Sequence, residues 1–267
     1  MPPVLELDRS ARKTVVRRHQ KFRCRWLQGE RDLLVYLPPA YDESPRRRYP
    51  VFYLQDGQNL FDPATAFIRG RDWRADVTAD RLIRARAIEP LILVGIEHGG
   101  ERRLDEFTPT VDRHRGGGGQ ADLYGRALVE EIIPFINSQY RIRSGREHTA
   151  LGGSSLGGLV SLYLGIKHPR VFSKLAAMSP SVWWDAKVIL KHVAGLRSHP
   201  QTSIWLDAGT LEGDPELIHI RQLRDALARK GWVAGEDLHY AEVRGARHEE
   251  RHWGKRFGAV LRYLFPR

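Results

Sequence analysis

The sequence is poor in cysteine and in long apolar runs. Cys24 is the single cysteine among 267 residues, so no disulfide can form within the chain and folding does not require an oxidising compartment. The longest apolar runs, such as PLILVGI from Pro90, are far shorter than the roughly 20 residues that span a bilayer. Residues 1–41 contain no apolar core typical of a secretion signal. We therefore expect a soluble, unexported, cytoplasmic protein with no membrane partner.

Lysine is scarce although the chain is basic. It has 43 basic and 32 acidic residues, a net charge of +11, and a basic run extends from Arg9 to Arg25. Only 8 of the basic residues are lysines, and codon usage explains such an arginine bias as easily as a partner does. No binding module and no repeated interleaving of aromatic and basic residues is present. We expect no nucleic-acid partner; a non-catalytic basic binding protein is the alternative from another functional class.

Apolar runs bounded by turn residues alternate with segments of helical period, which predicts an α/β fold with a mostly parallel central sheet flanked by helices. Length favours one domain over 1–267, in which 1–30 is a basic leader segment or the first strand of the sheet. The glycine-rich stretch 113–120 is predicted to be a flexible loop. Predicted strands cover 32–38, 51–56, 91–97, 149–154, 174–179, 203–209 and 238–243, and predicted helices cover 121–140, 156–167, 215–231 and a last segment ending near Phe265.

One motif predicts a nucleophile. Gly153, Ser155 and Gly157 match G-x-S-x-G, and the motif joins a predicted strand to a predicted helix, the context in which the central serine is exposed on a sharp turn. Glycines leave room for the strand and the helix to pass closely. Ser155 is the predicted nucleophile, and the Leu156 amide with the helix dipole is predicted to stabilise an oxyanion. The alternative, a phosphate-binding loop, lacks both G-x-G-x-x-G and a Walker lysine.

A serine alone is a poor nucleophile and needs a histidine base. In the fold that carries this motif, the order along the chain is serine, acid, histidine. His248 lies directly after the last predicted strand and before the last predicted helix, in a loop. His239 and His252 are alternatives that fall within that strand and that helix. His248 is therefore the predicted base.

An acid must orient the base, and three carboxylates lie near the end of the strand predicted at 203–209. Glu212 is favoured because it lies beyond the strand, after two turn residues, where a carboxylate can reach the imidazole. Asp207 is expected within the strand. Asp214 is the alternative acid, although it can instead cap the helix that begins near Pro215.

Two further features concern the oxyanion site and a metal. In the stretch LQDGQNLFDP, Gly57 permits a tight turn that aims the Gln58 amide at the same point as the Leu156 amide; an ordinary Asp-Gly surface turn is the alternative. His248 to His252 also match H-E-x-x-H, a zinc-protease signature. That stretch is polar, whereas a zinc-binding helix of this kind is apolar between its ligands. We expect no metal and no cofactor.

Taken together, these stretches resemble the esterase family of α/β-hydrolases that includes siderophore (enterochelin) esterases, feruloyl and acetyl-xylan esterases, S-formylglutathione hydrolase and the mycolyltransferases. The similarity runs from about Leu33 to the C-terminus. It rests on LQDGQNLFD, DEFTPT, the glycine-rich run before LVEEIIPFINSQYRI, TALGGSSLGGL, SPSVWW and the spacing from His248 to Trp253.

The resemblance implies a carboxylic-ester hydrolase that forms an acyl-serine intermediate and uses no cofactor. The roles that it implies are Ser155 as nucleophile, Glu212 as acid, His248 as base, and Gln58 and Leu156 as backbone oxyanion donors. A siderophore-type or aromatic ester is the leading substrate; a carbohydrate-linked acyl esterase or an acyltransferase is the alternative.

Loops at the carboxyl ends of parallel strands line the ligand crevice in such folds, which suggests residues that contact the substrate. Arg102 and Arg103 follow the strand that ends near Glu97, and a cationic crevice would favour an anionic aromatic ester. Aromatic walls could bind its ring by stacking. The alternative is that the arginines are solvated and the tryptophans belong to the core. The candidate substrate-binding residues are Asp56, Arg103, Trp183, Trp184 and Trp253.

Overall fold

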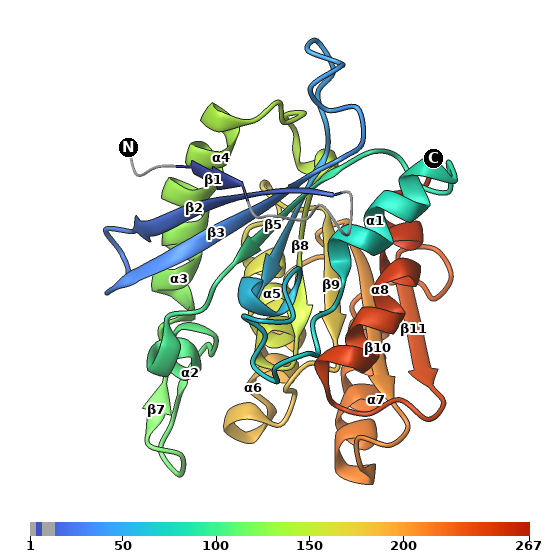
Figure 1. The fold of residues 1–267 in the computed structure, drawn as a ribbon. Helices are drawn as coiled ribbons and strands as arrows, with labels where there is room; N and C mark the ends of the chain where they lie inside the picture. Colours follow the sequence, from blue (N-terminus) through green and yellow to red (C-terminus); the bar gives the residue numbers. More distant parts are fainter. Residues whose placement is uncertain (1–3, 7–13) are drawn as a thin grey trace.

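The computed structural model describes residues 4–6 and 14–267, and its centre is a nine-stranded sheet (Figure 1). The strand order is β1-β2-β3-β5-β4-β8-β9-β10-β11. The first three neighbouring pairs in this order, from β1 to β5, are antiparallel. The remaining five pairs, from β5 to β11, are parallel. The predicted fold class is therefore confirmed. The strands are β1 (Val4–Glu6), β2 (Val15–Arg23), β3 (Glu30–Leu37), β4 (Val51–Gln55), β5 (Ile92–Ile96), β8 (Thr149–Ser154), β9 (Lys174–Met178), β10 (Ser203–Gly209) and β11 (Leu238–Val243).

Helices cover both faces of this sheet (Figure 1). Side chains alternate along β4, so Phe52 and Leu54 pack beneath α1 and α8, and Tyr53 packs beneath the helices of the other face. Residues 185–187 at the start of α6 have left-handed dihedral angles, so its regular part begins at Val188. The helices are α1 (Ala75–Arg84), α2 (Arg103–Glu106), α3 (Ala121–Ala127), α4 (Ile133–Gln139), α5 (Leu156–Lys167), α6 (Trp184–Ala194), α7 (Asp214–Arg229) and α8 (Glu250–Leu264).

The structure adds helices that the sequence analysis did not predict, among them α1 and α6, and it differs from the expectations in further places. The predicted helix over 121–140 is interrupted by a π-helical turn at Leu128–Ile132, next to Pro134, which has no N–H to donate. The stretch 113–120, expected as a loop, contributes β7 (Gly117–Gly118), which pairs with β6 (Val111–Asp112). Of the two readings of residues 1–30, the strand reading agrees with the described part, because β1 and β2 join the sheet; residues 1–3 and 7–13 lie outside the described residues.

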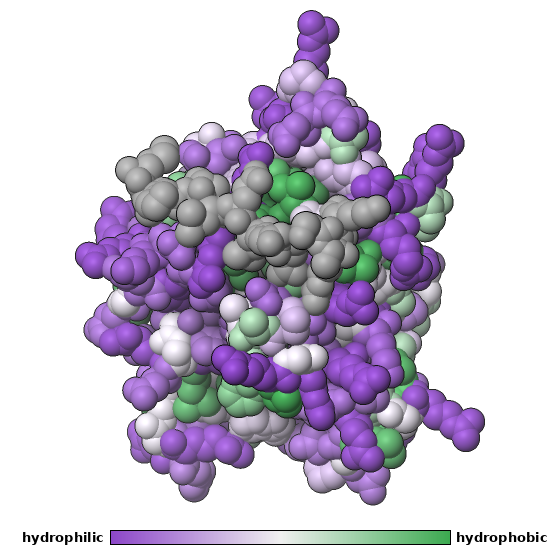
Figure 2. Space-filling view, in the orientation of Figure 1, coloured by the Kyte–Doolittle hydropathy of each residue, from purple (hydrophilic) through white to green (hydrophobic). Residues whose placement is uncertain are grey.

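The three predicted triad residues and Gln58 lie in loops that leave the carboxyl ends of parallel strands. These loops are residues 56–59 after β4, Ser155 after β8, 210–213 after β10 and 244–249 after β11. Parallel strands bring such loops to one edge of the sheet, where α/β proteins bind ligands. Polar side chains cover most of the face shown in Figure 2. No helix in the described ranges is long and apolar enough to cross a bilayer.

Candidate active site

Ser155 occupies the sharp turn between β8 and α5. Its backbone dihedral angles are φ 56° and ψ −125°, a strained combination for a residue with a side chain. A Cβ atom at Gly153 would lie 2.8 Å from the carbonyl carbon of Gly157, and one at Gly157 would lie 3.0 Å from Cβ of Gln55. The predicted close passage of strand and helix is therefore confirmed, and it explains why glycine stands at both positions.

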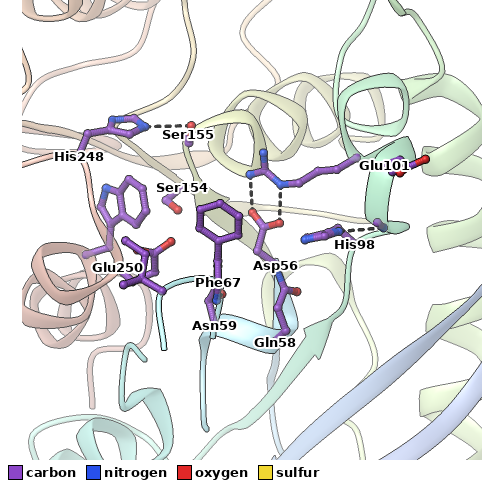
Figure 3. Close-up of a pocket in the computed structure, with 14 residues that line it drawn as sticks. Asp56, Gln58, Asn59, Phe67, His98, Glu101, Ser154, Ser155, His248 and Glu250 are labelled. Carbon is purple, nitrogen blue, oxygen red and sulfur yellow. Dashed lines mark hydrogen bonds and ion pairs between the residues drawn. The ribbon is translucent and has the colours of Figure 1, made fainter. Parts of the chain in front are cut away.

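Ser155, His248 and Glu212 form one hydrogen-bonded chain. The Ser155 hydroxyl donates to Nε2 of His248 at 2.9 Å (Figure 3), and Nδ1 of His248 lies 2.9 Å from Oε2 of Glu212. An ionised carboxylate can only accept, so Nδ1 carries the ring proton and Nε2 is the acceptor. An imidazole held in this way can take the proton of the serine hydroxyl.

The other carboxylate oxygen of Glu212 accepts hydrogen bonds from two further groups. Its Oε1 accepts hydrogen bonds from Ser179 Oγ at 2.7 Å and from the Gly209 amide at 2.6 Å. Arg256 lies 3.6 Å from the same oxygen. Burial opposes ionisation of Glu212, but the hydrogen bonds from His248, Ser179 and Gly209 outweigh it and lower the pKa of this carboxyl. Glu212 is therefore ionised at neutral pH.

The two alternative acids do not reach the imidazole. Asp207 lies within β10, as predicted, fully buried and 3.1 Å from Arg256; burial is the main reason that its pKa rises to about 6. Asp214 is an exposed first residue of α7. Asp214 does not take the alternative role of a helix cap either, because Gly213 occupies the N-cap position and no side chain caps the helix.

The two expected oxyanion donors flank Ser155. Leu156 is the first residue of α5, so its amide is among the helix N-terminal donors that have no intrahelical acceptor. Gln58 lies in a 3₁₀ turn, Gly57–Asn59, and lines the same cavity as Ser155. The reason for glycine at position 57 differs from the expectation. The left-handed residue of this turn is Asp56, with φ 56°, whereas a Cβ at Gly57 would lie 2.7 Å from the backbone of Gly95.

A cavity of about 550 Å³ opens beside Ser155 (Figure 3). Arg103 lines it, and its guanidinium donates two hydrogen bonds of 2.7 Å to Asp56. The described lining residues therefore do not form the expected cationic crevice. Their one arginine is paired with Asp56, and the other two residues with acidic side chains are Glu101 and Glu250. Arg102 is exposed and does not line the cavity. The lining residues are Asp56, Gln58, Asn59, Phe67, Ile68, His98, Gly100, Glu101, Arg103, Ser154, Ser155, His248, Glu250 and Trp253.

The sequence and the fold of this chain are similar to those of known esterases. The model of the family described as "Putative esterase" matches residues 25–264. The uncharacterised protein YbbA of Bacillus subtilis is 27% identical over 250 residues, 89% of this chain and 93% of YbbA. Ferri-bacillibactin esterase BesA of the same organism is 30% identical over 198 residues, 67% of this chain and 65% of BesA. The solved enterobactin esterase FES of Shigella flexneri shares the fold, with a TM-score of 0.72 at 20% identity over 93% of this chain and 59% of FES.

The chain belongs to this esterase family. The resemblance predicted from the sequence is thereby confirmed, and so are the α/β-hydrolase fold and the enzyme class, a carboxylic-ester hydrolase.

Two of the five candidate substrate-binding residues lie away from the cavity of the esterase. Trp184 is fully buried, and its indole N–H donates to the Thr110 carbonyl at 3.0 Å. The Arg115 guanidinium lies over the Trp183 ring, with 4.3 Å between Cζ and the ring centroid. Both follow the end of β9, but their neighbours in the fold are residues 110–118. Asp56, Arg103 and Trp253 do line the cavity.

The H-E-x-x-H match does not form a zinc site in the esterase. His248 precedes α8, so it and His252 do not project from one helix as the motif requires. His252 instead faces Glu249, with 3.3 Å between Nε2 and Oε1. No group of three or more His, Cys, Asp or Glu side chains within the described ranges is arranged to hold a metal ion.

Several residues around the site carried no recognisable sequence signal. Phe67 and Ile68 come from an irregular loop, and Glu250 begins α8. The contacts of Ser179 and Arg256 with Glu212 could not be predicted either, because these residues lie 33 and 44 positions away from it in the chain. The one available signal was position, since Ser179 directly follows the carboxyl end of β9.

Replacement of Gly57 by alanine is expected to damage both stability and turnover. The added methyl would meet the backbone of Gly95 at 2.7 Å and of Ile96 at 2.8 Å, so β5 and the Gln58 turn must separate. We expect the free energy of unfolding to fall by about 1–3 kcal/mol and kcat for a short-chain ester to fall by about 10²-fold, as when an oxyanion donor is lost.

Urea denaturation and steady-state kinetics measure these two effects. Gly195→Ala is the matched control, because a Cβ there has its nearest contact at 3.4 Å, and it should change neither quantity appreciably. Wild-type turnover in Gly57→Ala would contradict a role for the Gln58 turn.

Proposed function

We propose that this esterase acts through a Ser155–His248–Glu212 triad and a covalent acyl-serine intermediate. The observation that carries the proposal is the unbroken chain of hydrogen bonds, 2.9 Å from Ser155 to His248 and 2.9 Å from His248 to Glu212. It is supported by the strained backbone of Ser155, which exposes Oγ at the start of α5.

In this mechanism, Nε2 of His248 takes the hydroxyl proton as Oγ of Ser155 attacks the ester carbonyl carbon. The Gln58 and Leu156 amides stabilise the oxyanion, and the ionised Glu212 stabilises the imidazolium. The C–O bond to the alcohol then breaks, and His248 returns the proton to the leaving alkoxide. Water attacks the acyl-serine with His248 again as base, which releases the carboxylic acid and restores the serine.

For the substrate, we propose a siderophore-type or aromatic ester. The named activities of BesA and FES support the first class. The Phe67 and Trp253 rings in the cavity wall support an aromatic group, since such rings stack with one another. Because Arg103 is paired with Asp56, an anionic charge on the substrate is not part of this proposal.

A fluorophosphonate that labels active serines tests the mechanism. We expect stoichiometric loss of esterase activity, with the adduct mapped by mass spectrometry to the peptide that contains Ser155. The substrate is tested in parallel by hydrolysis of p-nitrophenyl esters, feruloyl esters and a catecholate siderophore. Complete labelling of another residue, with Ser155 unmodified, would overturn the proposed nucleophile.

A further inference from the structure

Glu250 is a buried carboxylate that the proposed mechanism does not use. It is the first residue of α8, is 6% exposed and lines the cavity that contains Ser155. Its carboxylate accepts a hydrogen bond from its own backbone amide. Among the described residues, no other group donates a hydrogen bond to this side chain and no cation forms an ion pair with it. A buried carboxylate ordinarily forms an ion pair with a cation. Glu250 has no such cation among the described residues, and a ligand could supply it.

The charges around Glu250 do not provide that partner. Burial first, and then the fields of Asp56 and Glu249, raise the pKa of Glu250, while the hydrogen bond from its own backbone amide and the field of His248 oppose the rise. Arg103, the single arginine or lysine among the described lining residues, feels the charge of Glu250 but forms its ion pair with Asp56, at 2.7 Å. With Glu101 also in the wall, acidic groups outnumber cationic ones, so this cavity attracts a positive charge.

Aromatic rings face the same space. Phe67 is 80% exposed although it is large and apolar, and its amide donates to Oδ1 of Asn59 at 2.8 Å, which fixes the backbone at that point. Figure 3 shows Phe67 and Glu250 both directed into the cavity below Ser155. Trp253 lines it from the next turn of α8. Aromatic faces attract cations, and a carboxylate among such faces is a typical receptor for an ammonium group.

We propose that Glu250, Phe67 and Trp253 bind a positively charged ammonium group of the ester substrate, beside the scissile bond. This inference rests on the proposed function and narrows its substrate class to esters that carry such a cation. Glu250 supplies the opposite charge, and the two rings cover the alkyl surface of the cation.

The test compares binding of isosteric esters to the Ser155→Ala variant of the 267-residue chain, in which no turnover interferes. The probes are the choline and 3,3-dimethylbutyl esters of butyric and benzoic acids, which have the same shape and differ by one positive charge. Calorimetry near neutral pH should give a Kd for the choline ester about tenfold lower than for its neutral isostere, a difference of about 1.4 kcal/mol.

Variants made in the same background locate the site. Glu250→Gln should lower the ratio of the two Kd values from about ten to about three, the part that the aromatic rings contribute. Phe67→Leu, which keeps the apolar bulk and removes the aromatic face, should lower the ratio about threefold; because this residue lies in an exposed loop, it tests the site even if Glu250→Gln folds poorly. Glu236→Gln is the charge-matched control on an exposed residue before β11 and should preserve the ratio.

Equal affinity for the two isosteres in the parent protein would overturn the cation site. The cation site would also be overturned if each of the single variants, Glu250→Gln and Phe67→Leu, kept the full preference for the choline ester. Hydrolysis of the same esters by the unmutated protein tests the proposed function separately. A tenfold binding preference without any ester turnover would support the cation site and count against the triad mechanism.

Discussion

Ser155→Ala is expected to lower kcat for ester hydrolysis by about 10⁶-fold, the loss measured when the nucleophile of a serine protease triad is removed. The substitution deletes the hydroxyl that donates to Nε2 of His248 at 2.9 Å, and with it the oxygen that is proposed to form the acyl intermediate. The measurement is single-turnover and steady-state hydrolysis of a p-nitrophenyl ester by the purified variant, with thermal unfolding to verify that the fold is retained.

Ser154→Ala is the matched control, because it removes an identical hydroxyl one residue earlier. Ser154 ends β8 with its side chain 5% exposed, whereas the strained turn directs Ser155 toward His248. We expect Ser154→Ala to retain most of the wild-type kcat. Loss of activity in Ser154→Ala with normal activity in Ser155→Ala would show that the turn presents the other serine.

Those parts of the site that depend on local chain direction could be predicted from the sequence. The G-x-S-x-G turn needs only a strand, a helix and small neighbours, all of which are contiguous from residue 149 to 167. His248 could be placed because a loop that follows the last strand must emerge at the carboxyl edge of the sheet. Glu212 could be preferred to Asp207 because a residue beyond a strand end is free to turn toward that edge.

Contacts between distant segments could not be predicted in this way. Arg103 was expected to give the cavity a positive charge, but Asp56, 47 positions earlier, accepts both of its hydrogen bonds. The pairing depends on where two loops come together after the sheet has formed, and no periodic pattern encodes it. Trp184 shows the same limit, since its burial depends on residues near Thr110 that pack over α6.

Glu212→Gln is expected to lower kcat by about 10⁴-fold while the fold is retained, as an Asp-to-Asn change does in the serine-protease triad. The surrounding donors fix the orientation of the new amide. The Gly209 amide donates to the Oε1 position at 2.6 Å, so the amide oxygen of glutamine must occupy it and the NH₂ group must take the Oε2 position. That group can only donate, which forces Nδ1 of His248 to accept and moves the ring proton to Nε2.

With the proton on Nε2, His248 cannot accept the Ser155 hydroxyl proton, so acylation should be slowed far more than substrate binding. Pre-steady-state kinetics should therefore show a greatly reduced burst rate with a nearly unchanged Kd. Asp214→Asn is the matched carboxylate-to-amide control on an exposed residue of α7, and we expect it to change kcat by less than about threefold, as for a surface substitution. The opposite result, a large loss in Asp214→Asn and a mild one in Glu212→Gln, would transfer the role of the acid to Asp214, because only an acid that fixes the His248 tautomer can produce the slow acylation.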